Sequence, residues 1–209
     1  MKILLLGASG NVGRLVVAKL LADGHDVVAF VYGAAPFEET DHLHIVQGDV
    51  HKEADIRQAL DGVEVVMSTL GSWHTKTQDI LASAMANAVP AMKSTGISRI
   101  ITLTGSDARL PGERPTFWQR LLRPVFMVIA PKILRDGETH LRILAESGLA
   151  WTTLRSPVMR SKGEEGRSRL TANPPKPWES IHRNDVAAQL VNLLKDDTFA
   201  GRAPHIHSH

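Results

Sequence analysis

The stretch that decides the fold is GASGNVG, residues Gly7 to Gly13, which directly follows the apolar run Ile3 to Leu6. A short apolar run that ends in glycine and leads into helical periodicity is typical of the first strand and helix of a βαβ unit. Gly7 permits a tight turn, Gly10 lets a ligand approach the backbone, and Gly13 lets the helix pack closely on the strand. The stretch therefore predicts a strand-turn-helix corner with an accessible backbone.

The composition bounds the class of protein. The 209 residues are 43% hydrophobic, which predicts one domain, residues 1–209, around one core. No run of about 20 apolar residues occurs, and the first apolar run is too short for a signal peptide, so we expect a cytoplasmic protein without a membrane partner. The absence of cysteine excludes disulfides, zinc-thiolate sites and thiol nucleophiles. A net charge of +2 with scattered arginines disfavours a nucleic-acid partner and suits an anionic small molecule.

Short runs of branched residues alternate with helical periodicity along the chain, which is typical of a parallel sheet buried on both faces. The predicted strands are Lys2–Leu6, Val27–Val31, His44–Gln47, Val63–Ser68, Arg99–Leu103 and Trp151–Leu154. The predicted helices run from about Asn11 to Asp23, and over Glu53–Leu60, Lys76–Thr95, Arg135–Ser147 and Asn184–Leu194. This order predicts an α/β Rossmann fold, a doubly wound and mostly parallel sheet with helices on both faces.

Two stretches interrupt the alternation. Residues 107–134 and 156–178 are rich in proline, with aromatic residues in the first and charges in the second. Both follow the carboxyl end of a predicted strand, where ligands bind in open α/β sheets. We expect them to be small excursions from the sheet that form the substrate side of the crevice. The histidine-rich end, His205 to His209, is expected to be disordered.

Four later segments can be compared with known families. They are Gly48-Asp49-Val50, Thr69-Leu70-Gly71, AESGLAWTTLRSP over residues 145–157, and IHRNDVAAQLVNLLKDD over residues 181–197. Together with the G-x-x-G-x-x-G spacing, they resemble the short-chain dehydrogenase/reductase superfamily, in particular its atypical, NmrA-like NAD(P)-binding branch and the biliverdin-IXβ and flavin reductases within it. Ser156 departs from the family pattern, because it separates Arg155 from Pro157.

The resemblance implies a dinucleotide at the glycine corner, where backbone amides and the positive end of the helix dipole favour a pyrophosphate. Asp49 and Val50 would contact adenine, although Asp49 could instead cap its own turn. The backbone of Leu70 and Gly71 would pass the nicotinamide ribose. The corner residues expected to bind the cofactor are Gly7, Ser9, Gly10, Asn11, Val12 and Gly13. Asn11 could also serve as a helix cap.

The residue after the second strand discriminates between the two nicotinamide dinucleotides. An acid there would bind the ribose hydroxyls and repel a 2′-phosphate, whereas an arginine would pair with that phosphate. This chain has Tyr32, which could stack on adenine or donate its hydroxyl. Ser9 and Arg14 lie near enough along the loop to contact a phosphate. The expected cofactor is NADP(H), with NAD(H) as the alternative.

The residues for the usual reductase chemistry are missing. Most short-chain reductases protonate a developing alkoxide with a Tyr-x-x-x-Lys pair. Tyr32 is the only tyrosine, and the positions that resemble the pair hold Pro131 and Arg135. Arginine cannot donate a proton near neutrality. Hydride transfer to a flavin, a quinone or a similar conjugated acceptor needs mainly alignment, so such an acceptor fits better.

The candidates on the acceptor side follow the fourth, fifth and sixth predicted strands. Thr104 and Ser106 occupy the place of the family's catalytic serine, where they could bond the acceptor or only stabilise the turn. Trp73, His74 and Pro157 are candidate substrate-binding residues. His74 could donate a proton or be an ordinary exposed histidine.

Aromatic residues of the first excursion are also open to two interpretations. Phe117, Trp118 and Phe126 could form a stacking wall, or belong to an amphipathic segment that folds onto the sheet. No metal site is expected, since His42 and His44 lack a third ligand.

The leading hypothesis is an NAD(P)H-dependent oxidoreductase, acting as a monomer or homodimer on a flavin, a quinone or a similar acceptor. An NmrA-like redox sensor that binds the dinucleotide without turnover is the alternative. A sugar-nucleotide epimerase or isomerase is disfavoured by the missing pair.

Overall fold

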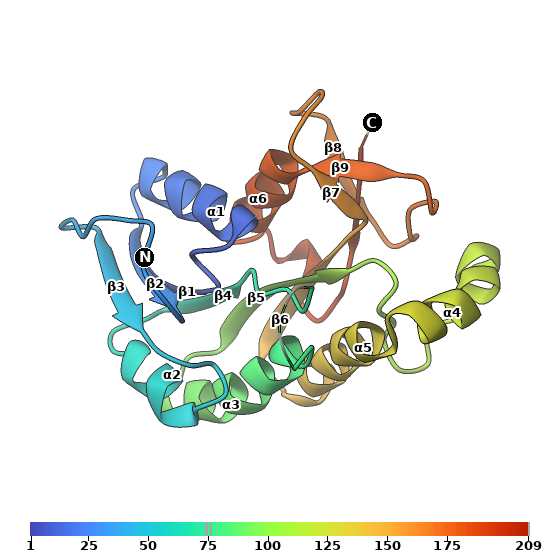
Figure 1. Cartoon of the computed structure of the whole chain (residues 1–209). Coiled ribbons are helices and arrows are strands. Elements are labelled where there is room, and N and C mark those ends of the chain that lie inside the picture. Colours follow the sequence, from blue (N-terminus) through green and yellow to red (C-terminus); the bar gives the residue numbers. More distant parts are fainter. Residues whose placement is uncertain (74, 76, 209) are drawn as a thin grey trace.

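An eight-stranded sheet forms the centre of the protein in a computed structural model that describes residues 1–73, 75 and 77–208 (Figure 1). Its order is β3-β2-β1-β4-β5-β6-β10-β8, and all neighbours are parallel except β10 and β8. The strands are β1 Lys2–Leu6, β2 Asp26–Val31, β3 Leu43–Gln47, β4 Val65–Ser68, β5 Arg99–Gly105, β6 Ala150–Ser156, β8 Ser168–Thr171 and β10 His205–Ser208. A second, parallel pair joins β7 Val158–Arg160 to β9 Ser180–His182.

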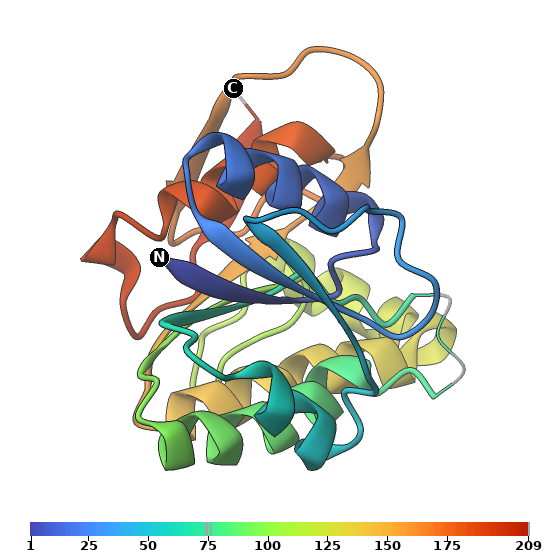
Figure 2. The same cartoon turned by 90° about the vertical axis from the view of Figure 1, so that its left-hand side faces the viewer.

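Helices cover both faces of the sheet (Figures 1 and 2). One face carries α1 Asn11–Ala22 and α6 Arg183–Asn192, and the other carries α2 Glu53–Ala59, α3 Ile80–Thr95 and α5 Pro131–Glu146. A further helix, α4 Phe117–Ile129, precedes α5, and the 3-10 turn η1 spans Asp197–Phe199. The predicted Rossmann fold is confirmed.

The first strand shows why the sheet is buried on both sides. Ile3 and Leu5 pack in the core under α1 and α6, while Leu4 and Leu6 pack toward α2 and α3. All four side chains are fully buried. A parallel strand covered by helices on both faces needs such a continuous apolar run, because alternate residues point to opposite faces. The chain crosses from β2 and β3 on one side of β1 to β4 on the other, which opens the ligand-binding crevice of this fold.

The first excursion contains more regular structure than expected. Helix α4 begins after Thr116, whose hydroxyl accepts from the Gln119 amide while the Gln119 side chain accepts from the Thr116 amide. This reciprocal capping box is a sequence signal for a helix start. Helix α5 begins at Pro131, four residues earlier than predicted, because proline suits the first turn of a helix. The predicted start of α3 at Lys76 lies outside the described residues, and that helix begins at Ile80.

The prediction of a disordered C-terminal end is wrong for His205–Ser208. These residues form β10, between β6 and β8. Ile206 and His205 are fully buried, so the strand alternation of this segment places an apolar side chain in the core. The last predicted residue of that end, His209, lies outside the described residues.

Candidate functional site

The glycine corner is shaped by two close approaches. Gly7 has a φ of +79°, and a Cβ there would lie 3.0 Å from the Leu70 nitrogen. A Cβ on Gly13 would lie 2.2 Å from the Gly7 carbonyl oxygen and 2.7 Å from that of Ala8, so α1 can approach the loop this closely only with glycine. The turn and packing roles expected for Gly7 and Gly13 therefore match the geometry.

The start of α1 leaves backbone donors at this corner. Gly10 is the N-cap, and no side chain caps the helix start within the described part of the chain. The Arg14 amide is the first to bond back into the helix, to the Gly10 carbonyl at 3.0 Å, which leaves the amides of Asn11, Val12 and Gly13 ahead of it. A Cβ on Gly10 would meet only the Gly7 oxygen, at 3.3 Å. The corner fits a pyrophosphate, since unbonded amides and the helix dipole both favour an anion there.

Arg14 is held at the same corner. Its Nε donates to the Ser9 carbonyl oxygen at 2.9 Å, and the side chain is otherwise exposed. Within the described residues its guanidinium makes no other hydrogen bond, so donors remain available on the outside of the phosphate loop.

The loop after β4 is fixed to the glycine corner. The Thr69 hydroxyl donates to the Gly7 carbonyl at 3.1 Å, and the Thr69 amide donates to the Leu6 carbonyl at 2.9 Å. Leu70 is half-buried and Gly71 is exposed. The structure thus brings the predicted ribose segment against the predicted phosphate loop.

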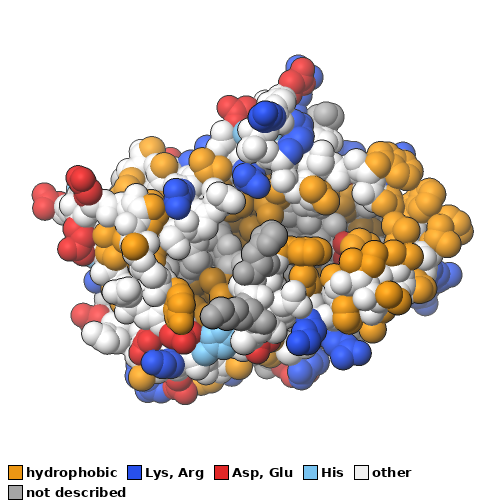
Figure 3. All heavy atoms as spheres, viewed as in Figure 1, with side chains coloured by type: hydrophobic (Ala, Val, Ile, Leu, Met, Phe, Trp, Pro, Cys, Tyr) orange, Lys and Arg blue, Asp and Glu red, His pale blue; other side chains and the backbone are white. Residues whose placement is uncertain are grey.

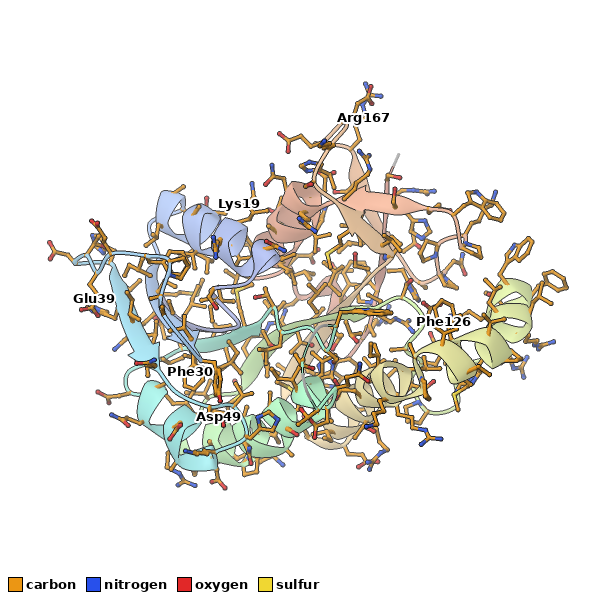
Figure 4. All side chains as sticks on the ribbon, in the orientation of Figure 1. Lys19, Phe30, Glu39, Asp49, Phe126 and Arg167 are labelled. Carbon is orange, nitrogen blue, oxygen red and sulfur yellow. The ribbon has the colours of Figure 1, made fainter. Side chains whose placement is uncertain are left out.

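The predicted adenine segment lies beside β2. A Cβ on Gly48 would lie 2.6 Å from Phe30 Cζ, which makes this a close turn, and Figure 4 shows Phe30 and Asp49 near each other. Asp49 Oδ1 accepts from the His51 amide at 3.0 Å and bonds His51 Nδ1 at 2.8 Å. These hydrogen bonds hold the pKa of Asp49 below its usual value. Asp49 thus caps its own turn, and its contact with adenine stays a prediction.

Two further adenine-side residues differ in exposure. Val50 is buried, and its carbonyl accepts from the Asn87 amide group at 2.8 Å. Asn87 therefore anchors this loop to α3, a role that the sequence did not suggest. Tyr32 directly follows β2 and is 79% exposed, so its ring is free to meet a ligand.

A hollow of about 80 Å³ lies where β5 and β6 end. Ser106 and Pro157 both line it, so the structure brings together two candidates from segments far apart in the chain. The remaining lining residues are Asp107, Trp118, Gln119, Leu122, Phe126, Val158, Pro174, Pro175, Lys176, Pro177 and Glu179. Trp73 is exposed and does not line this hollow. His74 lies outside the described residues.

Thr104 and Ser106 differ in their surroundings. Thr104 is buried beneath α5, and a Cβ on Gly137 would lie 2.9 Å from its hydroxyl oxygen. Ser106 is half-buried at the hollow, and its amide donates to the Ser156 carbonyl at 2.9 Å. Ser106 is therefore the better placed of the two to reach an acceptor.

Asp107 is a site residue that the sequence reasoning missed. It lines this hollow and a narrow adjoining gap between α4 and α5. More than a third of its surface is exposed, yet the surrounding protein atoms desolvate the carboxyl and raise its pKa. The available signal was its position directly after Ser106 at the end of a strand.

A buried ion pair shapes the same region. Arg155 is 2% exposed, and its guanidinium donates to both carboxylate oxygens of Glu113, at 2.6 and 2.8 Å. It also donates to the carbonyls of Ala203 at 2.8 Å and Ala108 at 3.2 Å. Burial alone would raise the pKa of Glu113, but the hydrogen bonds and charge of Arg155 outweigh it and lower the pKa. Arg155 thus ties the loop before α4 to the strand ends.

His207 fixes the opposite wall. Its Nδ1 bonds a carboxylate oxygen of Glu179 at 3.0 Å, and its Nε2 lies 2.9 Å from the Asn173 carbonyl and 3.1 Å from the Thr171 hydroxyl. These contacts hold both ends of the proline-rich segment that lines the hollow. His207 is therefore a structural part of the candidate site.

Buried polar groups on α5 secure the helices beside the site. Asp136 accepts from the amides of Leu81 at 3.1 Å and Ala82 at 2.7 Å, and also from the Ser72 hydroxyl. It therefore caps α3 from a different helix. Burial raises the pKa of Asp136. His140 is fully buried against the Thr102 hydroxyl, at 3.0 Å, and burial lowers its pKa to about 3.

Two kinds of feature are absent from the described residues. They contain no group of three or more His, Asp or Glu side chains placed to hold a metal ion. None of their helices is long and apolar enough to cross a membrane.

Comparison with known proteins identifies the family. The model of the NAD(P)H-binding family matches residues 7–197, so the chain belongs to that family. The predicted resemblance to NmrA-like short-chain reductases and the predicted nicotinamide dinucleotide are confirmed at this level.

Individual relatives are distant. Uncharacterized protein Rv2047c of Mycobacterium tuberculosis is 26% identical over 206 residues, which cover 94% of this chain and 20% of that protein. The chain thus spans about a fifth of the length of such mycobacterial relatives. Uncharacterized sugar epimerase YhfK of Bacillus subtilis is 26% identical over 212 residues, which cover 97% of this chain and 92% of that protein. The solved structure of ChuY, an anaerobillin reductase from Escherichia coli O157:H7, superposes with a TM-score of 0.80 at 20% identity, covering 100% of this chain and 97% of that one.

Proposed function

We propose that this protein is a reductase that passes hydride from NAD(P)H to a flavin, a quinone or a similar conjugated acceptor. The observation that carries the proposal is the hollow beside Ser106, which has aromatic and proline walls and opens at the carboxyl ends of β5 and β6. Only β4 separates β5 from the glycine corner strand β1 in the sheet. Neighbouring strands are about 4.8 Å apart, so the ends of β5 and β6 are offset sideways from β1 by roughly 10 to 15 Å. A dinucleotide bound at the corner can span such an offset along the sheet edge.

Each group of residues has its own role in the proposed reaction. A nicotinamide cofactor would supply the hydride when bound, and the amides at the start of α1 would hold its pyrophosphate. Trp118 and Phe126 offer flat apolar faces to a conjugated ring. The Ser106 hydroxyl orients the acceptor, and the Asp107 carboxyl, with its raised pKa, donates a proton to the reduced ring. No tyrosine is needed, which agrees with Pro131 and exposed Arg135 standing where the family's pair would be.

We also propose that NADP(H) is the preferred cofactor. Arg14 is anchored to the Ser9 carbonyl with free guanidinium donors, which can pair with a 2′-phosphate. Tyr32, exposed after β2, covers the adenine side without the negative charge that would repel that phosphate.

The test is oxidation of NADPH with FMN, a soluble quinone and a linear tetrapyrrole, the last chosen because ChuY is described as an anaerobillin reductase. We expect turnover with at least one of them. Asp107→Asn should lower kcat about 100-fold, since it removes a general acid. Ser106→Ala should lower it about tenfold, the worth of one hydrogen bond. Both variants should keep the affinity for NADPH, and the exposed Ser161→Ala is the matched control.

The outcomes separate the alternatives. Tight NADPH binding with no oxidation by any acceptor would contradict a reductase and favour the redox sensor. Unchanged kcat in both variants would remove the hollow from the mechanism.

A further inference from the structure

Helix α4 presents its apolar face to solvent. Val128 is 82% exposed, Phe117 70% and Leu121 55%. They are four and seven positions apart, which places all three on one side of the helix. Val125 and Ile129 extend that side. A helix of a globular domain normally points such a face at the core, so this helix has the reverse orientation.

The opposite face of α4, which mixes polar and apolar residues, makes the contacts with the domain. Arg123 forms a bidentate ion pair with Glu138 of α5, at 2.7 and 3.1 Å. Gln119 and Phe126 are half-buried and line the hollow. This arrangement fixes the helix with its apolar residues outward, and Figure 3 shows hydrophobic side chains gathered over the end of the molecule where α4 lies.

Aromatic side chains extend the exposed apolar surface. Trp118 packs edge to face against Phe117, with ring centres 5.3 Å apart, and against Trp178, at 5.4 Å. Trp178 follows the proline-rich wall and is 65% exposed, with the Lys176 ammonium 5.7 Å from the centre of its ring. Tryptophan and lysine side by side are typical of groups that lie at a membrane-water interface.

The border of this surface is cationic. Residues 109–135 contain six arginines and lysines and one acid, Glu113, which is paired with buried Arg155. Four of those basic side chains are exposed, and none has a carboxylate partner in the described part of the chain. They are Arg114, Arg120, Lys132 and Arg135. An anionic surface complements this border.

We propose that α4 docks on anionic phospholipid, lying flat in the headgroup region with Phe117, Leu121 and Val128 in the apolar layer. An apolar face of Phe, Leu and Val bordered by arginines is the composition of interfacial helices. A second copy of the chain fits less well, since a two-fold contact through α4 would set one cationic border against another. Thirteen residues are too few to span a bilayer but enough to lie on it. This proposal revises the expectation that the protein has no membrane partner.

The docking would also serve the candidate site. Helix α4 contributes its inner residues Gln119 and Phe126 to the hollow while its outer residues face lipid. An acceptor that dissolves in the bilayer, such as a quinone with an alkyl chain, could then enter from the membrane side. This second step rests on the proposed function.

The test is sedimentation of the full chain with vesicles of phosphatidylcholine alone or of equal parts phosphatidylcholine and phosphatidylglycerol. We expect binding to the anionic vesicles that weakens with salt. The double variant Leu121→Glu/Val128→Glu and the double variant Arg114→Gln/Arg120→Gln should each bind about tenfold more weakly. Ala18→Glu, on the exposed side of α1, and Arg167→Gln, on the loop before β8 (Figure 4), are the matched controls. Unchanged NADPH affinity will show that each variant is folded.

The outcomes are distinct. Absence of sedimentation with anionic vesicles overturns the docking, as does a dimer in solution that the double glutamate variant separates. Turnover of an alkyl quinone that anionic vesicles do not stimulate overturns the second step. Turnover of a soluble quinone tests the proposed function separately.

Discussion

The cofactor side and the proposed acceptor side of this molecule are built by different kinds of interaction. The glycine corner is mostly local, since its turn, its close helix and its amides come from Gly7 to Arg14, while Thr69 and Leu70 pack against Gly7 from outside this stretch. The acceptor hollow depends on distant partners, such as Arg155 with Glu113, 42 residues apart, and His207 with Glu179, 28 residues apart. A local motif can therefore announce a cofactor, whereas the acceptor side becomes visible only when the chain is folded.

The largest expected effect breaks the cofactor side alone. Gly10→Glu should weaken NADPH binding by at least about 100-fold, because it places a negative side chain where the pyrophosphate would sit. The position is exposed and a Cβ there meets only one atom, at 3.3 Å, so the fold should persist. Calorimetric titration with NADPH measures the loss, and urea unfolding of the same variant is the control. Retained affinity in a folded variant would mean that the phosphates lie elsewhere.

Lowering the pH should reduce the free energy of unfolding, because two histidines are buried on the proposed acceptor side of the molecule. Burial lowers the pKa of His140 to about 3, and burial with the nearby charge of Arg155 lowers the pKa of His205 to about 2. Their ordinary pKa is about 6.5, so below that pH the unfolded chain binds protons that the folded chain excludes. The stabilisation is complete above about pH 6.5 and falls by about 1.4 kcal/mol per pH unit for each histidine as the pH drops.

Urea unfolding at pH 7 and pH 5 checks this prediction. Between these values His140 alone should account for about 2 kcal/mol of lost stability. The variant His140→Leu should therefore lose about 2 kcal/mol less than the wild type over the same interval, whatever its stability at pH 7. Equal losses in the two proteins would show that His140 takes up a proton in the folded state.

The smallest effect sharpens the cofactor side. Arg14→Gln should reduce the preference for NADPH over NADH about tenfold, because it removes the charge-assisted bonds to the 2′-phosphate. Affinity for NADH should change little. Lys19→Gln removes the same charge further along α1 and serves as the control (Figure 4). An unchanged ratio of the two dissociation constants would assign cofactor selectivity to another group.

The sequence predicted the central sheet well because its strands are continuous apolar runs between glycine-ended helices. All six predicted strands occur, and each pairs in parallel with the neighbours expected for a Rossmann fold. The three glycines could be assigned because their roles are steric and lie within one turn. Predicted contacts with the cofactor and acceptor depend on bound ligands and remain predictions.

The features that the sequence failed to predict share one physical cause. Each depends on contacts between residues that are far apart in the chain. The end of the chain contains four polar residues among five and looks unable to fold, yet β6 and β8 pair with it and bury His205 and Ile206. The amphipathic pattern of residues 117–129 allowed the interpretation that the apolar face packs onto the sheet. Periodicity alone does not show which face of a helix meets the domain. The pair between Arg123 and Glu138 settles the orientation. Asp107 was missed because its desolvation comes from the folded surroundings.

The most direct test of the central claim is a single turnover with NADPH that carries deuterium at the transferred position of its nicotinamide, using the acceptor that supports oxidation. We expect a slower transfer step with the labelled cofactor, and we expect the nicotinamide to lose the label in that step. We also expect Asp107→Asn to retain the bound NADPH while slowing its oxidation. Bound NADPH that keeps its deuterium in the presence of every acceptor would contradict the account.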